Sequence, residues 1–195
     1  MNFDFQVKEL GIEYGVILGN EKIVFIKCGL LGSLRGYHDK YLKVAKELNK
    51  EYGYTVVCST NPDLGKIDQL QLGINFITNL AKDNNLLNFE IYYMGNSLAG
   101  MYGAKYGYLH QEIKKMLLIN APLLKNVDLL LSGLRKFNGD KVVLVYGEAD
   151  PSFKNTELLK LVSNDKVFVE IIKNADHNFT NQEVIFENLI FKYLL

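Results

Sequence analysis

Three residues of this sequence have side chains that could together perform acyl transfer: Ser97, Asp150 and His177, in that order along the chain. A serine hydroxyl is a weak nucleophile until a neighbouring imidazole takes its proton. A carboxylate beside the imidazole fixes its tautomer and stabilises the imidazolium that forms. These residue types therefore suggest Ser97 as nucleophile, His177 as general base and Asp150 as its acid partner.

Ser97 lies in the segment FEIYYMGNSLAGMYGAKY, which runs from Phe89 to Tyr106. An apolar strand-like run leads into Gly95-Asn96-Ser97-Leu98-Ala99-Gly100, which has small residues on both sides of the turn, and a helix-like pattern follows. A tight turn from strand to helix exposes its central side chain over the end of a sheet, and glycine permits the sharp reversal. The helix N-terminus favours developing negative charge. A helix N-cap serine with no chemical role is the alternative explanation.

Asp150 in VVLVYGEADP and His177 in VFVEIIKNADHNF each follow a strand-like run. Taken singly, Asp150 is also explained as a turn residue and His177 as a solvated loop histidine. All three candidates lie past strand ends in the order that a triad needs, which favours the catalytic interpretation. Asp176 and Glu148 are rival carboxylates, and Asp150 is preferred because it lies three residues beyond the strand-ending Gly147.

Composition limits the class of protein. The 195 residues are 48% hydrophobic and 23% charged, which predicts a single domain over residues 1–195. The formal net charge is zero and no basic run is present, so nucleic acid is not an expected partner. The first residues, MNFDFQVKEL, lack the pattern of a signal peptide, and no apolar stretch is long enough to span a membrane.

The two cysteines, Cys28 and Cys58, each lie in an apolar run and fit no disulfide or metal pattern. We expect reduced thiols in a cytoplasmic protein. Of the three histidines, His38 and His110 lie far from acidic or cysteine clusters, so no metal site is expected.

The period of hydrophobicity alternates between strand-like and helical along the chain, which is typical of an α/β sheet. Strands are predicted at Phe5 to Glu9, Ile12 to Leu18, Ile23 to Cys28, Thr55 to Ser59, Phe89 to Met94, Lys115 to Ile119, Val142 to Tyr146 and Val167 to Ile172. Helices are predicted at Tyr37 to Glu51, Ile67 to Asp83, Leu98 to His110, Leu124 to Lys136, Asn155 to Val162 and Gln182 to Leu194. The first three strands are too close for crossovers, so we expect antiparallel hairpins, the second turning at Gly19 and Asn20.

Chain-reversing residues gather where predicted strands end. Gly29, Gly95 and Gly147 directly follow strands, and three prolines come within a few residues of other strand ends. In open α/β sheets the binding crevice lies at the carboxyl edge of the strands. We therefore expect the functional site at this edge.

An acyl-transfer site also needs hydrogen-bond donors for the developing oxyanion. The backbone N–H groups of Leu98, after the nucleophile, and of Leu30, in the loop from Cys28 to Ser33, are the candidates. The same loop could be a plain glycine-rich turn or a phosphate cradle. It contains neither the G-K-[ST] of a P-loop nor the G-x-G-x-x-G of a dinucleotide site.

The motifs G-N-S-L-A, C-G-L-L-G-S, G-E-A-D-P and A-D-H-N-F resemble those of the serine α/β-hydrolase superfamily, over nearly the whole chain. The resemblance implies a mostly parallel eight-stranded sheet with an antiparallel second strand and helices on both faces. It implies a Ser97, Asp150 and His177 triad, oxyanion donors at Leu30 and Leu98, and no cofactor. Two departures from the family pattern are Ala99, usually a glycine, and Cys28, where the loop commonly begins with His-Gly.

The segment from Ala121 to Asp140 is too short for the lid domain that many members of this superfamily insert there. An open site with an apolar wall for an acyl group is expected, formed by Leu30, Leu31, Leu123 and Phe179. Asn61 and Asp63 could add polar contacts or could form a simple turn.

These expectations favour a serine esterase or thioesterase acting on a small acyl substrate through an acyl-enzyme. A catalytically silent hydrolase-like binding module is the second hypothesis, because fold does not dictate function. A flavodoxin-like binder of nucleotide or flavin at the turn from Gly29 to Ser33 is the third.

Overall fold

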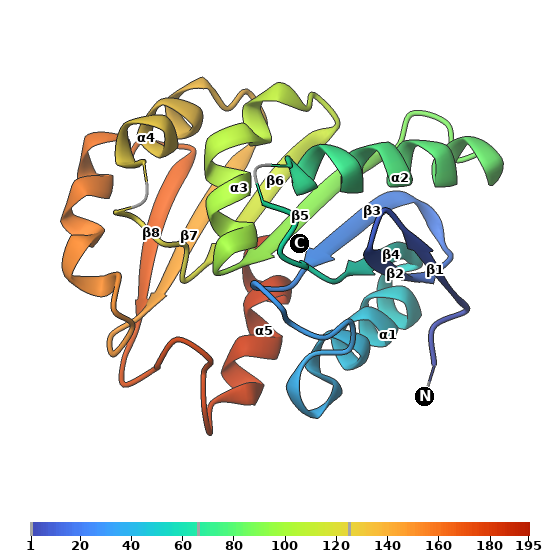
Figure 1. Ribbon diagram of the computed structural model, residues 1–195, viewed down its shortest axis with the longest axis horizontal. Helices are drawn as coiled ribbons and strands as arrows, with labels where there is room; N and C mark the ends of the chain where they lie inside the picture. Colours follow the sequence, from blue (N-terminus) through green and yellow to red (C-terminus); the bar gives the residue numbers. More distant parts are fainter. Residues whose placement is uncertain (1, 66, 125) are drawn as a thin grey trace.

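The computed structural model describes residues 2–65, 67–124 and 126–195, and its central feature is a twisted sheet (Figure 1). Within these residues, eight strands pair in the order β1-β2-β4-β3-β5-β6-β7-β8. Their bounds are β1 Phe5–Glu9, β2 Ile12–Ile17, β3 Asn20–Lys27, β4 Tyr54–Ser59, β5 Glu90–Asn96, β6 Ile113–Ile119, β7 Lys141–Gly147 and β8 Val167–Ile172. All adjacent pairs from β4 through β8 are parallel, and β2 is antiparallel to both of its neighbours. The predicted fold class is confirmed.

The second predicted hairpin is wrong, because β4 lies between β2 and β3. β4 is apolar and almost entirely buried, and a strand covered on both faces is most stable inside a parallel sheet. The short β2 to β3 connection instead crosses the amino end of β4, where Asn20 N–H donates to Gly53 O at 2.7 Å. A Cβ at Gly19 would lie 2.3 Å from the same carbonyl oxygen, so only glycine fits this crossing.

Helices cover both faces of the sheet. α2, α3 and α4 lie on one face and α1 and α5 on the other (Figure 1). The α-helices are α1 Lys40–Tyr52, α2 Gln69–Asp83, α3 Leu98–Tyr106, α4 Val127–Lys136 and α5 Glu183–Tyr193, and the 3₁₀ helices are η1 Tyr37–Asp39, η2 Gly107–Leu109 and η3 Phe153–Leu161.

The structure corrects four predicted helices. The helix predicted at Leu98 to His110 ends at Tyr106 as α3 and is followed by the 3₁₀ helix η2. The helix predicted to start at Tyr37 begins at Lys40, because His38 and Asp39 have φ of 50° and 60°, outside the helical region. The helix predicted at Asn155 to Val162 is instead the 3₁₀ segment η3. α4 begins at Val127 rather than Leu124, and Lys125 of that prediction lies outside the described residues.

The hydrophobic core has two layers, one on each face of the sheet. Residues of β3 alternate between them, with Phe25 in one layer and Val24 and Ile26 in the other. This burial on both faces fixes the central strands, so that the loops at their carboxyl ends start from a rigid support.

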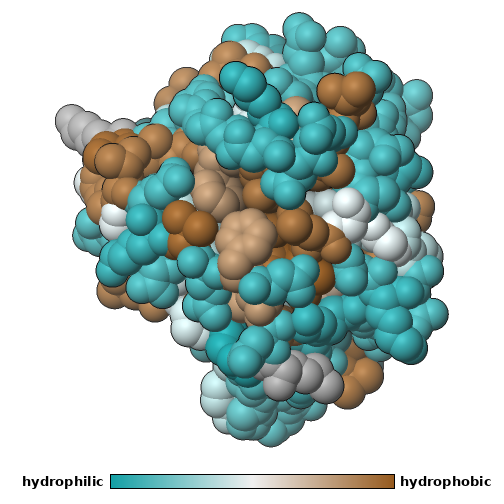
Figure 2. All heavy atoms as spheres, turned by 90° about the vertical axis from the view of Figure 1, so that its right-hand side faces the viewer, coloured by the Kyte–Doolittle hydropathy of each residue, from teal (hydrophilic) through white to brown (hydrophobic). Residues whose placement is uncertain are grey.

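Figure 2 views the molecule from the side of the edge strand β1. Polar side chains cover most of this face, and apolar side chains gather in its middle. Among the helices of the described residues, none has the length and apolar character needed to cross a membrane.

Candidate active site

Ser97 forms a strained turn between β5 and α3. Its φ of 52° and ψ of −118° lie outside the usual regions for a residue with a side chain. Ser97 N–H donates to Ile119 O at 2.7 Å and Ser97 O accepts from Met101 N–H at 3.1 Å, so both strand and helix hold the turn. Backbone strain of this kind costs about 1–3 kcal/mol and is typical of functional sites.

Gly95 allows α3 to pack closely on β5. A Cβ at Gly95 would lie 2.7 Å from the carbonyl carbon of Ala99 and 2.8 Å from Gly100 N. Ala99 itself is fully buried, so the extra methyl that it adds relative to glycine fits between strand and helix.

Gly95→Ala is therefore expected to destabilise the fold by about 3 kcal/mol or more, because the clash is with backbone that cannot rotate away. Urea denaturation measures the change. Gly65→Ala is the matched control: among the described residues other than its chain neighbours, none has an atom within 4 Å of the added Cβ, so the φ of 67° is what opposes the substitution, at a cost of about 1 kcal/mol. Equal losses in the two variants would contradict the packing argument.

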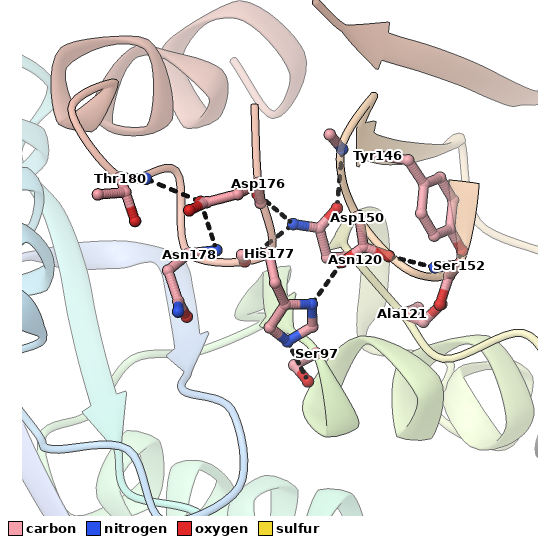
Figure 3. A network of polar contacts seen from close by, with 11 residues as sticks. Ser97, Asn120, Ala121, Tyr146, Asp150, Ser152, Asp176, His177, Asn178 and Thr180 are labelled. Carbon is pink, nitrogen blue, oxygen red and sulfur yellow. Dashed lines mark hydrogen bonds and ion pairs between the residues drawn. The ribbon is translucent and has the colours of Figure 1, made fainter. Parts of the chain in front are cut away.

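The structure brings Ser97, His177 and Asp150 together at the carboxyl edge of the sheet (Figure 3). Nε2 of His177 lies 3.0 Å from Oγ of Ser97, and Nδ1 of His177 contacts Oδ2 of Asp150. The imidazole thus has a hydroxyl at one nitrogen and a carboxylate at the other, the arrangement that a nucleophile, base and acid require.

Asp150 is 3% exposed, and its other oxygen, Oδ1, accepts the N–H of Ser152 at 2.6 Å. The rival carboxylates have other partners. Asp176 Oδ1 accepts the N–H groups of Thr180 and Asn178, which lower the pKa of Asp176. Glu148 Oε2 accepts the N–H of Asn174. Among the three carboxylates, the geometry therefore favours Asp150.

Sequence reasoning missed Asn120, a fully buried residue with φ of 48° that directly follows β6. Its Nδ2 donates to His177 O at 2.9 Å and to Asp176 O at 3.3 Å, and its Oδ1 accepts Gly147 N–H at 2.9 Å (Figure 3). One amide therefore ties the loop that carries His177 to the end of the strand that precedes Asp150. A polar residue immediately after a buried strand was the available signal.

Asn120→Asp is expected to lower the free energy of unfolding by about 1–3 kcal/mol. Aspartate keeps the acceptor for Gly147 N–H but replaces two donated hydrogen bonds by repulsion between oxygens. Urea denaturation of the variant tests this. Asn188→Asp, on the exposed face of α5, makes the same chemical change and is expected to alter stability by less than about 0.5 kcal/mol. Similar effects at both positions would refute a bridging role for Asn120.

The loop after β3 is held against Ser97. A Cβ at Gly29 would lie 3.2 Å from Ser97 Cβ, so the loop backbone runs beside the serine. Leu31 N–H donates to Asn61 O at 2.9 Å and Gly32 N–H to Gly29 O at 2.9 Å. Within the described parts of the chain, the N–H groups of Leu30 and Leu98 have no hydrogen-bond acceptor, which leaves these two predicted donors free for a ligand oxygen.

Asn61 is fully buried and does not line the cleft beside Ser97. Its backbone carbonyl accepts the Leu31 N–H and so holds this loop in place. Cys28 lies behind the loop, where its Sγ contacts Gly32 O at 3.2 Å. Burial raises the pKa of Cys28 to about 11, so its thiol is neutral near pH 7 and is a poor nucleophile.

A cleft of about 650 Å³ opens beside Ser97 and His177. Its other lining residues are mostly polar or glycine: Gly29, Leu30, Gly32, Ser33, Gly36, Tyr37, Lys40, Tyr41, Asn96, Asn178, Thr180 and Glu183.

The predicted apolar wall is therefore largely wrong. Leu30 lines the cleft, but Leu123 and Phe179 are 1% and 0% exposed and pack in the two core layers. Phe179 packs edge-on against Phe186 of α5, 5.4 Å between ring centroids. Leu31 is 75% exposed and does not line the cleft, because its φ of 56° is part of a turn that places it outside.

Within the described residues, no group of three or more histidine, cysteine or acidic side chains is placed to hold a metal ion.

Comparison with known proteins identifies the architecture. No protein-family model matches the chain, and comparison with curated proteins found no match in sequence. Solved structures are similar in fold. Est1E from Butyrivibrio proteoclasticus has a TM-score of 0.73 at 13% identity, with 96% of each chain covered. An alpha-beta serine hydrolase homologue from Coxiella burnetii has a TM-score of 0.71 at 15% identity, covering 98% of this chain and 97% of that one.

Dienelactone hydrolase from Anabaena variabilis has a TM-score of 0.65 at 18% identity, covering 100% of this chain and 99% of the other. At these identities the similarity concerns the fold, and it extends over almost the entire chain in each case. The sheet order, the antiparallel β2 and the turn at Ser97 agree with this result. The chain therefore has the α/β-hydrolase fold.

Proposed function

We propose that this protein is a serine hydrolase that cleaves a carboxylic ester or thioester of a small substrate through an acyl-enzyme. The observation that carries the proposal is the contact chain from Ser97 Oγ through the His177 imidazole to the buried Asp150 carboxylate. The strained Ser97 turn and the two free N–H groups beside it support the same reaction. The similar solved structures include proteins named as hydrolases, a thioesterase domain among them.

In the first half of the reaction, Ser97 Oγ attacks the acyl carbon while its proton passes to His177 Nε2. The carbonyl oxygen becomes an oxyanion, which the N–H groups of Leu30 and Leu98 would stabilise. The tetrahedral intermediate then expels the alcohol or thiol, which takes the proton from His177. The products of this half are the Ser97 ester and the free leaving group.

In the second half, water attacks the Ser97 ester and gives a proton to His177 Nε2. Collapse of the second tetrahedral intermediate releases the carboxylic acid, and His177 returns the proton to Ser97 Oγ. Asp150 stays ionised throughout and stabilises the imidazolium in both halves.

A p-nitrophenyl ester series of increasing acyl length, with matched thioesters, tests the proposal. We expect release of p-nitrophenol with an initial burst and, after acid quenching, an acyl group located on Ser97 by peptide mass mapping. Turnover with the acyl group on another residue, or no acyl group at any time, would refute the acyl-enzyme at Ser97. A folded protein without turnover of any ester would favour the binding-module hypothesis.

A further inference from the structure

Lys40, the first residue of α1, is a buried cation in the wall of the cleft that contains Ser97 and His177. The residue is only 7% exposed. Within the described residues, no carboxylate lies within 4.0 Å of its Nζ, and none of its three N–H groups has a hydrogen-bond acceptor. Lysine is rarely buried in this way, because an ammonium removed from water needs compensating partners.

An aromatic ring supplies part of that compensation. Nζ of Lys40 lies 3.9 Å from the ring centroid of Phe186 on α5 and 5.6 Å from that of Tyr41. A cation over a ring face is attracted by the ring quadrupole. The phenyl ring has no lone pair, however, so it cannot accept a conventional hydrogen bond from the ammonium N–H groups. The ammonium is therefore held in place while its hydrogen-bonding capacity remains unused.

Three carboxylates act on Lys40 from neighbouring elements. Burial lowers the pKa of Lys40, and Glu183, Glu187 and Asp176 oppose that shift by favouring the charged form. Glu187 Oε1 lies 3.9 Å from Lys43 Nζ. Asp176 Oδ1 accepts the N–H groups of Asn178 and Thr180 within its own loop. Glu183 alone of the three carboxylates lines the cleft with Lys40.

We propose that Lys40 determines specificity by binding an anionic group, such as a carboxylate, on the ester substrate. This inference rests on the proposed function and adds a substrate class to it. A negatively charged group entering the cleft would supply the acceptors that the ammonium lacks, in a partly desolvated place where a charge-assisted hydrogen bond is strong. The ester would then lie at Ser97 with its charged end towards α1 and α5.

Two matched pairs of esters test the proposal, one for each side of the scissile bond. Acyl-side charge is varied with p-nitrophenyl hemisuccinate against p-nitrophenyl pentanoate. Alcohol-side charge is varied with the acetyl ester of 4-hydroxybenzoate against that of 4-hydroxybenzamide. The ratio of kcat/KM for the anionic ester to that for the neutral ester is measured in wild type and variants.

In at least one pair, Lys40→Met is expected to lower the ratio by about 10-fold or more, the size of a lost hydrogen bond to a charged group. Lys40→Arg should retain most of the preference, and Glu183→Gln should increase it by removing a repelling charge. Lys46→Met is the matched control, because Lys46 is on the same helix but does not line the cleft. Its Nζ lies 3.9 Å from Asp4 Oδ1. Lys46→Met should leave the ratio unchanged.

The ratio stays unchanged in Lys40→Met if kcat/KM is the same as in wild type or falls equally for the anionic and the neutral ester. An unchanged ratio in both pairs would overturn the proposal and leave Lys40 a structural cation. Binding of monomethyl succinate to the Ser97→Ala protein, by calorimetry, separates this failure from failure of the proposed function because it needs no turnover. We expect binding that weakens about 10-fold or more when Lys40→Met is added. Equal affinity with and without Lys40 would refute the anionic subsite whatever the protein's activity.

Discussion

Ser97→Ala is expected to lower kcat for ester hydrolysis by at least about 10⁴-fold, because it removes the nucleophile of the proposed reaction. His177 Nε2 lies 3.0 Å from Ser97 Oγ, and the substitution removes this hydroxyl and no other reacting group. The backbone bonds of Ser97 to Ile119 and Met101 do not involve the side chain, so the turn should persist. Initial rates with a p-nitrophenyl ester measure the loss.

Ser163→Ala provides the control, because Ser163 is exposed and, among the described residues, its hydroxyl donates to Leu159 O alone, at 3.0 Å. It should hydrolyse the ester at the wild-type rate. Circular dichroism should show that both variants are folded. A folded Ser97→Ala protein that keeps more than about a tenth of the wild-type kcat would eliminate Ser97 as the nucleophile.

The second large effect is expected for Asp150→Asn, about 10⁴-fold in kcat with the fold retained. Asp150 accepts hydrogen bonds on both oxygens, from Ser152 N–H and from His177 Nδ1–H. Asparagine has one oxygen. Because Ser152 N–H cannot accept, that oxygen should turn to Ser152 and the amide NH₂ to His177 Nδ1. Nε2 would then carry the imidazole proton and could not take one from Ser97.

The comparison variant is Asp176→Asn. Asp176 uses Oδ1 for the N–H groups of Asn178 and Thr180, and asparagine can retain that oxygen, so kcat should change less than about 10-fold. Steady-state kinetics of the two variants decide between the carboxylates. An active Asp150→Asn protein beside an inactive Asp176→Asn protein would reverse the assignment of the acid.

Sequence patterning predicted the elements of the fold better than their pairing. Buried apolar runs such as β6 and β7 are recognisable locally, because each is covered on both faces. The position of β4 between β2 and β3 depends on contacts between segments distant in the chain, so a local rule for short connections gave a hairpin instead. The segment η3 and the late start of α1 depend on local backbone geometry that periodicity does not encode.

The candidate site likewise combines residues that the sequence indicates locally with residues whose position depends on contacts between distant segments. The proximity of Ser97, Asp150 and His177 was predictable because each follows a strand end, and the carboxyl ends of parallel strands meet at one edge. Leu123 and Phe179 also follow strands, yet their apolar side chains pack into the two core layers. Asn120 and Lys40 acquire their significance only from partners on other loops and helices.

The most direct test of the central claim is intact-mass analysis of the purified protein after treatment with a fluorophosphonate probe, with Ser97→Ala treated in parallel. The probe phosphonylates an activated serine without requiring knowledge of the substrate. The account predicts a single adduct on the wild-type protein and none on the variant. A folded wild-type protein without an adduct, or an adduct that persists in Ser97→Ala, would contradict it.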